Sequence, residues 1–193
     1  MSKIFYLMGK SASGKDTIYK RIREALPELQ PVVIYTTRPI RAGETEGVEY
    51  HFTDEEGFEK WAISGKVIEA RTYQTVHGPW TYFTADDGQF DGGNGRLAIG
   101  TLESYLQMRQ YFGPEKVEPI YVEVEDGLRL SRALERERRQ ENPKYQELCR
   151  RFLADSEDFS EEKLAEAEIS KRYQNIDIEE CLEEILLGIR DKM

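Results

Sequence analysis

Short apolar runs alternate with amphipathic segments along this chain. The apolar residues from Ile4 to Met8 end at a glycine and predict a buried strand, and residues 17–26 place apolar side chains at helical spacing before Pro27. The same order recurs later in the chain. A strand is predicted over 96–100, a helix that ends at a Gly-Pro pair over 102–112, and another strand over 119–124. Strands that alternate with helices predict a parallel sheet flanked by helices.

The middle of the chain has a different pattern. Strand-like runs there are short and are separated by polar, glycine-rich turns: 32–35, 50–52 and 66–71. A helix is predicted over 54–63 with Asp54 as its cap. These elements predict a small mixed insertion in the main fold.

Helical spacing dominates the last third of the chain. The charged region 126–167 is helical in pattern with a break at Asn142-Pro143, and the final segments predict a strand within 168–177 and a helix over 178–189. We therefore predict one domain over residues 1–193 with three parts. They are a core (about 1–35, 86–128 and 156–193), an insertion (about 36–85) and an Arg-rich helical lid (about 129–155).

Composition and charge narrow the range of partners. With 193 residues, 39% of them hydrophobic, the chain can form one sizeable core, and a net charge of −10 disfavours nucleic acids and anionic membranes. No uncharged apolar run of about 18 residues is present, and we expect neither a membrane span nor an export signal. Cys149 and Cys181 lack close-spaced partners, which indicates free thiols and a cytoplasmic location. We infer no protein partner.

The segment from Met8 to Thr17, "MGKSASGKDT", carries the clearest chemical signal. It matches the pattern G-x-x-x-x-G-K, in which backbone N–H groups surround phosphate oxygens and a lysine adds positive charge. Its place between a predicted strand and a predicted helix is the context that this motif requires. The candidate ATP-binding residues here are Gly9, Lys10, Ser11, Ala12, Ser13, Gly14, Lys15, Asp16 and Thr17.

Asp16 departs from the motif, which usually has Ser or Thr at this position. Mg²⁺ accepts carboxylate oxygens, so Asp16 is our candidate metal ligand for an ion that enters with ATP. Two alternatives remain open. Asp16 points away while Thr17 and water serve the metal, or the substitution has damaged catalysis.

A second group of phosphate-seeking residues follows in "TTRPIRAGETEGVEYHF", residues 36–52. Arg38 and Arg41 lie three residues apart in a turn and can converge on one dianion, and Tyr50 can donate a hydroxyl hydrogen bond. This block, downstream of a phosphate-binding loop, resembles the guanylate kinase family. The resemblance implies that Arg38, Arg41 and Tyr50 hold the phosphate of the acceptor nucleotide.

The same resemblance assigns further residues. "KVIEA" (66–70) is similar to the family segment whose glutamate binds guanine, here Glu69, and a carboxylate can accept from both N1–H and N2–H₂ of that base. "HGPWTYFT" (77–84) resembles the family hairpin more loosely, with Tyr82 as a phosphate ligand and Thr84 as a base contact. The lid resembles family helices that bring arginines to the phosphates, here Arg132, Arg136 and Arg151. Asn175 matches a family asparagine that lies near the adenine of the donor nucleotide.

Three positions depart from the family pattern. Gly100 and Leu102 replace two aspartates, one of them a base contact, and Ile34 replaces a serine that contacts the base. These losses weaken the expectation of strict guanine preference.

The resemblance implies a P-loop kinase fold of the α/β class. It has a parallel β-sheet core flanked by helices, a mixed α+β NMP-binding insertion and a helical lid. The implied reaction moves the γ-phosphoryl group of ATP to GMP with Mg²⁺, and Lys15, Arg41, Arg132, Arg136 and Arg151 are the expected catalytic residues. One alternative is a kinase of the same fold for another nucleotide or a sugar phosphate. The other is an inactive interaction module, which the intact Gly14-Lys15 pair disfavours.

Overall fold

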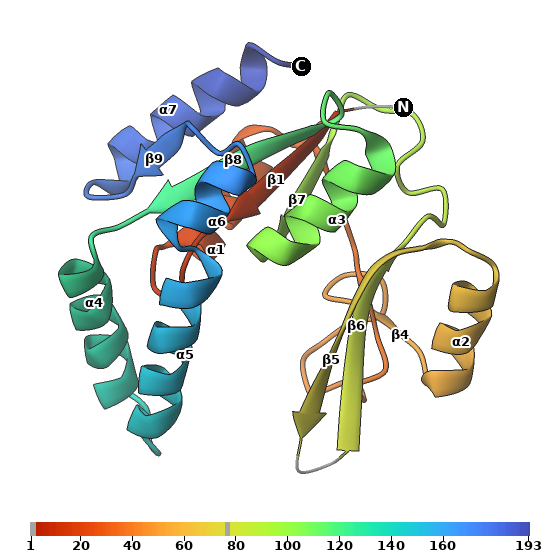
Figure 1. Cartoon of the computed structure of the whole chain (residues 1–193), viewed down its shortest axis with the longest axis horizontal. Helices are drawn as coiled ribbons and strands as arrows, with labels where there is room; N and C mark the ends of the chain where they lie inside the picture. The colour runs from red at the N-terminus through yellow and green to blue at the C-terminus, as the bar shows by residue number, and fades with distance from the viewer. Residues whose placement is uncertain (1–2, 76–77) are drawn as a thin grey trace.

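The computed structural model describes residues 3–75 and 78–193, and Figure 1 shows their arrangement. His77, at the start of the segment compared above with the family hairpin, lies outside the described residues. In chain order the elements are β1 (Ile4–Met8), α1 (Lys15–Ala25), β2 (Gln30–Pro31), β3 (Tyr35–Thr36), β4 (His51–Phe52), α2 (Glu55–Ile63), β5 (Val67–Thr75), β6 (Gly78–Ala85), β7 (Arg96–Gly100), α3 (Leu102–Phe112), β8 (Val117–Glu123), α4 (Asp126–Arg138), α5 (Tyr145–Asp158), α6 (Glu161–Glu166), β9 (Arg172–Gln174) and α7 (Ile178–Arg190).

The main sheet is parallel and has the strand order β2-β7-β1-β8-β9. β1 lies at its centre between β7 and β8, and all five of its residues are buried. A strand covered on both faces needs a continuous apolar sequence, which "IFYLM" provides. The prediction of a parallel sheet flanked by helices is confirmed.

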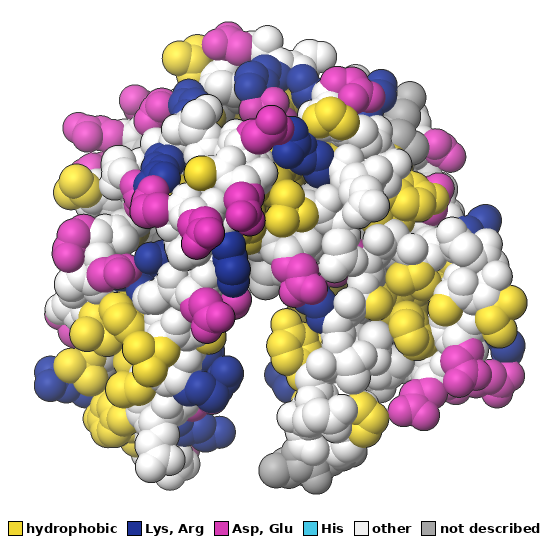
Figure 2. All heavy atoms as spheres, in the orientation of Figure 1, with side chains coloured by type: hydrophobic (Ala, Val, Ile, Leu, Met, Phe, Trp, Pro, Cys, Tyr) yellow, Lys and Arg dark blue, Asp and Glu magenta, His cyan; other side chains and the backbone are white. Residues whose placement is uncertain are grey.

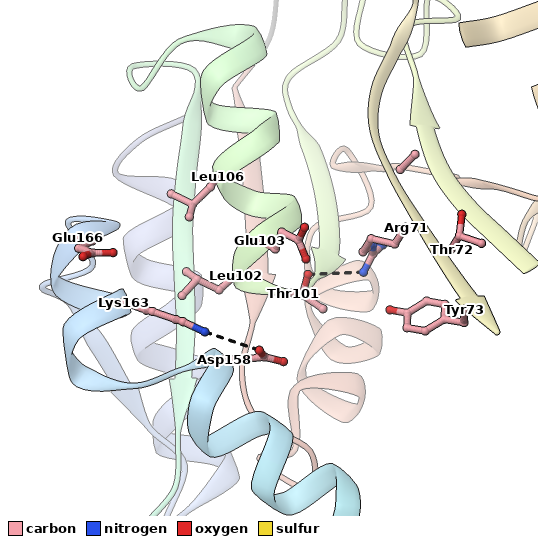
Figure 3. A pocket seen from close by; sticks show the side chains of 11 residues that line it. Arg71, Thr72, Tyr73, Thr101, Leu102, Glu103, Leu106, Asp158, Lys163 and Glu166 are labelled. Atoms are coloured by element: carbon pink, nitrogen blue, oxygen red, sulfur yellow. Dashed lines mark hydrogen bonds and ion pairs between the residues drawn. The ribbon is translucent and has the colours of Figure 1, made fainter. Parts of the chain in front are cut away.

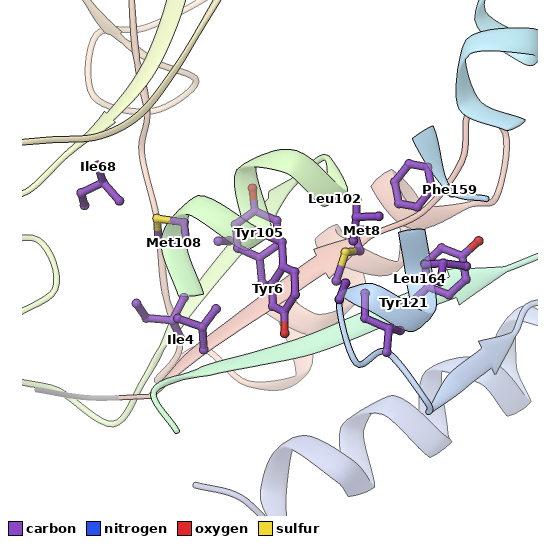
Figure 4. Close-up of a cluster of buried hydrophobic side chains, with 14 of the residues drawn as sticks. Ile4, Tyr6, Met8, Ile68, Leu102, Tyr105, Met108, Tyr121, Phe159 and Leu164 are labelled. Carbon is purple, nitrogen blue, oxygen red and sulfur yellow. The ribbon is translucent and has the colours of Figure 1, made fainter. Parts of the chain in front are cut away.

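Alternate residues of β1 supply two hydrophobic cores, one on each face of the sheet. Phe5 and Leu7 pack with apolar residues of α1 and α7, whereas Tyr6 and Met8 pack with residues of α3 and α6 (Figure 4). The helices on both faces of the sheet therefore pack against β1, the strand that leads into the phosphate-binding loop. No helix among the described residues is long and apolar enough to cross a bilayer.

The insertion forms a second, mixed sheet with the order β4-β3-β6-β5, in which β5 and β6 form an antiparallel hairpin. Asp54 caps α2 by accepting a hydrogen bond from the Gly57 amide, as its position predicts. The prediction of one strand over 32–35 is wrong. The chain leaves the main sheet after β2 and joins the second sheet at β3, and the Val33 amide between them binds the Gln89 side chain.

Two arms extend from the main sheet. One consists of α4 and α5, and the other of β5, β6 and α2 (Figure 1). Figure 2 shows an open hollow between these arms, with Lys and Arg side chains at its edges. The carboxyl end of β1 points toward this side of the molecule, where ligands of parallel α/β sheets usually bind.

Candidate active site

The phosphate-binding loop connects β1 to α1, and neighbouring backbone and side chains approach it closely. A Cβ atom at Gly9 would lie 2.6 Å from the Val122 carbonyl oxygen of β8. Gly14 has φ +88°, and a Cβ there would lie 2.3 Å from Nδ2 of Asn175. Packing therefore disfavours a side chain at both motif glycines, and at Gly14 the left-handed backbone conformation does so as well.

Asn175 supports this loop from the other end of the chain. It is 2% exposed, and its Nδ2 donates to the Ser13 carbonyl oxygen at 2.7 Å. Arg132 of α4 in turn donates to the carbonyl oxygens of Asn175 and Ile176 at 3.1 and 3.3 Å. The structure thus brings two predicted site residues together at the loop, in contact with backbone.

Lys15 and Asp16 begin α1. The Lys15 ammonium lies 3.6 Å from the Asp16 carboxylate, whose side chain is 74% exposed. Among residues 3–75 and 78–193, no group of three or more His, Cys, Asp and Glu side chains is placed to hold a metal ion. A single exposed carboxylate oxygen donor fits Mg²⁺ that arrives with nucleotide phosphates and keeps several waters.

The lid contacts the phosphate-binding loop through two residues that the sequence analysis did not single out. Asp155 of α5 accepts a hydrogen bond from the Ser11 amide at 2.8 Å. Arg129 of α4 is 1% exposed, and its Nη1 lies 3.3 Å from Asp155 and 3.4 Å from the Ser11 carbonyl oxygen. Its Nε and Nη2 also donate to Asp126 at 3.0 and 2.9 Å. Arg129 therefore ties both lid helices to the loop.

The other predicted lid arginines lie beside this contact. Arg136 and Arg151 line a small cavity of about 10 Å³ together with Ser11 and Arg129. Arg151 Nε lies 3.5 Å from the Glu147 carboxylate. Several guanidinium groups thus lie near one end of the phosphate-binding loop, where their charge favours an anionic ligand.

The residues predicted to clamp the acceptor phosphate lie near one another in the insertion. Arg38 is 2% exposed and donates to both carboxylate oxygens of Glu44, at 2.8 and 3.0 Å, and this hydrogen bonding raises the pKa of Arg38. The Arg38 guanidinium lies 5.2 Å from the Tyr50 ring centroid, and the rings of Tyr50 and Tyr82 are 5.7 Å apart. Arg41 is exposed and lies 6.0 Å above the Trp80 ring. The four predicted phosphate ligands therefore lie in one part of the insertion.

The predicted base contacts lie on one face of the β5–β6 hairpin. Glu69 is paired with Thr84 and Arg71 with Tyr82, and residues two apart on a strand point to the same side. Thr84 Oγ1 donates to Glu69 Oε1 at 2.7 Å, and both residues are 3% exposed. With Ile34 they line a cavity of about 10 Å³.

A larger cavity of about 700 Å³ adjoins this face (Figure 3). It lies between β5, the start of α3, the end of α5 and α6, and its lining includes Arg71, Tyr73, Leu102 and Asp158. Arg71 lines both cavities. Burial disfavours the charge of Arg71, but the neighbouring Glu69 carboxylate together with Tyr6, Tyr73 and Glu103 outweighs this effect, and the pKa of Arg71 is raised.

Gly100, which stands in place of a family aspartate, has no room for a side chain. A Cβ there would lie 2.2 Å from the hydroxyl oxygen of Tyr6. Burial, followed by the charge of Glu69, raises the pKa of Tyr6 far above its ordinary value. A neutral phenol thus occupies the space beside the base-contact residues.

This geometry agrees with the comparisons with known proteins. The guanylate kinase family model matches residues 1–79, which include the phosphate-binding loop, Arg38, Arg41, Tyr50 and Glu69. The guanylate kinase of Frankia casuarinae is 49% identical over 63 residues, 33% of this chain and 34% of that protein. The guanylate kinase of Salinibacter ruber is 32% identical over 129 residues, 67% of this chain and 56% of that protein. This chain belongs to the guanylate kinase family.

A solved structure extends the likeness of this guanylate kinase family member to the whole fold. The crystal structure of guanylate kinase from Anaplasma phagocytophilum aligns with a TM-score of 0.63 and covers 99% of this chain and 86% of that one, at 23% identity. The sequence matches are shorter. The chain spans about a third of the length of the Frankia casuarinae relative and little more than half of the Salinibacter ruber relative.

The departures from the family pattern lie at the base-contact face. Ile34 lines the small cavity with Glu69, and Leu102 lines the large one. Arg71 was not identified from the sequence, although its position two residues after Glu69 on a strand was a usable signal. The sequence indicated Arg129 more weakly, because solvent-exposed helices commonly carry arginines that have no functional role.

Proposed function

We propose that this chain transfers the γ-phosphoryl group of ATP to GMP and thereby produces ADP and GDP. The observation that carries the proposal is the acceptor site on the insertion. Arg38, Tyr50 and Tyr82 form a phosphate clamp. Glu69 presents a buried carboxylate on the β5–β6 hairpin, which also carries Tyr82. Such a pair of features suits a nucleotide with a phosphate at one end and a donor-bearing base at the other.

In this proposal each part of the chain has a separate task. Residues 9–17 bind the ATP phosphates through backbone N–H groups and Lys15, and Asn175 and Arg132 keep that loop in shape. Arg136 and Arg151 neutralise phosphate charge from the lid, and Arg41 does so from the insertion. The insertion about 36–85 and the lid about 129–155 close on their ligands and exclude water, so that ATP is not hydrolysed.

The chemical step needs no protein base. An oxygen of the GMP phosphate, which is largely dianionic at neutral pH because its second pKa is about 6, attacks the γ-phosphorus. The bond from the γ-phosphorus to the oxygen that bridges it to the β-phosphorus breaks, and ADP leaves. The residues of the chain position the two polyanions in line and offset their repulsion. Mg²⁺ bound with ATP, near Asp16, supplies further charge neutralisation.

The test is ADP release in a coupled assay with Mg·ATP and a panel of acceptors: GMP, dGMP, AMP, CMP, UMP and ribose phosphates. We expect turnover with GMP, and we expect Arg38→Met to lower kcat/KM for GMP about 10- to 100-fold because it removes charged hydrogen bonds to phosphate. Arg23→Met, which removes an exposed cation of α1, is the matched control and should leave this value unchanged.

Each other outcome of that assay favours a different function. Turnover with another acceptor alone would favour a kinase of the same fold with a different substrate. Failure to bind ATP at millimolar concentration would favour an interaction module. With GMP as acceptor, the enzyme acts in purine nucleotide metabolism, and its two free cysteines agree with the predicted cytoplasmic location.

A further inference from the structure

The side chains on the acceptor face form a row with a fixed order of hydrogen-bonding groups. Thr84 donates to Glu69 Oε1 at 2.7 Å, and Arg71 Nε donates to the other carboxylate oxygen, Oε2, at 3.2 Å. From Thr84 toward Arg71 the row therefore presents acceptor, acceptor and donor. The two neighbours hold the Glu69 carboxylate in one orientation.

Arg71 retains donors for a ligand. A guanidinium has five N–H groups in a planar fork. Nε binds Glu69, and Nη1 reaches Thr101 Oγ1 only at 3.5 Å (Figure 3). The Arg71 side chain is 16% exposed and borders both the small cavity beside Glu69 and the large one beside Leu102. A base that binds between these cavities would contact the remaining N–H groups of the Arg71 guanidinium.

The Watson–Crick edge of guanine has the complementary order. It presents N2–H₂, N1–H and O6, which are donor, donor and acceptor. We propose that Arg71 is a specificity-determining residue that donates a hydrogen bond to O6 of the acceptor guanine, while Glu69 accepts from N1–H and N2–H₂. This inference rests on the proposed function. It explains how guanine is selected with Ile34 and Leu102 at two base-contact positions of the family.

The same row disfavours adenine. Adenine places a bare N1 acceptor opposite a Glu69 oxygen and an amino donor opposite the Arg71 guanidinium. Two like-with-like contacts in a desolvated site reject the wrong base more strongly than the loss of one contact would. Arg71 thus adds both an attractive contact to guanine and a repulsive one to adenine.

The test compares three acceptors with wild type and Arg71→Met. GMP has O6, IMP has O6 but lacks the 2-amino group, and 6-thio-GMP keeps both base donors but replaces O6 with sulfur, a weak acceptor. Wild type should prefer GMP to 6-thio-GMP by about 10- to 100-fold in kcat/KM, because a hydrogen bond from a charged donor is lost. Loss of the Arg71 bond to Glu69 affects all three acceptors alike, so Arg71→Met should lower kcat/KM for GMP and IMP about 10- to 100-fold more than it lowers the 6-thio-GMP value.

Lys163→Met is the matched control, because it removes another cation from the lining of the large cavity and should leave the order of the three acceptors unchanged. An equal loss for all three acceptors in Arg71→Met would mean that Arg71 only orients Glu69, and it would overturn the inference. The wild-type comparison of GMP with 6-thio-GMP tests the inference even if Arg71→Met does not fold, since equal values would also overturn it.

Failure of the proposed function has a different signature. In that case wild type binds ATP but forms no GDP, and the inference fails with it. If GMP and 6-thio-GMP are converted at the same rate to GDP and 6-thio-GDP, the proposed function stands and only the role of Arg71 is refuted.

Discussion

Asn175 donates a hydrogen bond to the backbone carbonyl of Ser13 at 2.7 Å, across 162 residues of sequence. This bond joins the segment after β9 to the phosphate-binding loop after β1. Since Asn175 also occupies the space where a side chain at position 14 would lie, the two ends of the chain fit each other only with glycine there. The loop shape is therefore a property of the whole core.

Asn175→Ala should destabilise the loop and the protein together. It leaves the Ser13 carbonyl without its donor, so we expect the free energy of unfolding to fall by about 1–3 kcal/mol and the KM for ATP to rise. Urea unfolding and ATP kinetics measure the two effects. Glu179→Ala, which removes an exposed ion pair with Arg21 nearby, serves as the control and should cost less than about 1 kcal/mol. Equal losses in both variants would contradict the bracing role.

Tyr6 and Gly100 should show strong coupling in a double-mutant cycle. Gly100→Ala places a methyl group 2.2 Å from the Tyr6 hydroxyl, and we expect it to cost about 1–3 kcal/mol of stability through overpacking. In a Tyr6→Leu background that hydroxyl is absent, so the same substitution should cost less than about 1 kcal/mol. Chemical unfolding of the four proteins gives the coupling energy, and strictly additive costs would refute the steric explanation.

Arg129→Met should release the lid from the loop. The substitution removes a buried guanidinium that joins Asp126, Asp155 and the Ser11 carbonyl, and because both carboxylates are partly exposed we expect a cost of about 1–3 kcal/mol. Hydrogen exchange should speed up at the Ser11 amide. Arg150→Met removes an exposed cation of α5 that pairs with Glu147, and it should cost less than about 1 kcal/mol. An unchanged rate of hydrogen exchange at the Ser11 amide in Arg129→Met would contradict the role of Arg129 in linking the lid to the loop.

Stability should fall at acidic pH partly through Glu44. The hydrogen bond from Arg38 lowers the pKa of Glu44 below the ordinary 4.5. At pH values between the lowered folded pKa and 4.5, the unfolded chain therefore binds a proton at Glu44 more readily than the folded protein does. The contribution of Glu44 is therefore complete above pH 4.5 and is lost as pH falls through the lower folded value. The melting temperature of Glu44→Gln should change less with pH below 4.5 than that of wild type. Parallel profiles would contradict this.

The sequence predicted the parts of the fold that depend on local patterns. The apolar run of β1, the 11 residues of α3 and the Asp54 cap of α2 could all be predicted because each depends on residues close in sequence. The strand predicted over 32–35 failed because its apolar residues serve the passage between two sheets. That passage depends on a distant partner, Gln89, which no local pattern indicates.

The site was predictable to a similar degree. A motif with fixed spacing made Gly9, Gly14 and Lys15 candidate site residues, and the resemblance added Arg38 and Glu69 as candidates. The contacts of Arg129 with Asp155 and of Asn175 with Ser13 span 26 and 162 residues, so only the folded chain brings these groups together. The row of Thr84, Glu69 and Arg71 likewise requires the register of the β5–β6 hairpin.

The most direct test of the proposed activity is product analysis after incubation of the purified chain with Mg·ATP and GMP. Chromatographic separation of the four nucleotides should show ADP and GDP formed in equal amounts, with no ADP formed at a comparable rate when GMP is left out. ADP without GDP, or no product despite measurable ATP binding, would contradict phosphoryl transfer to GMP.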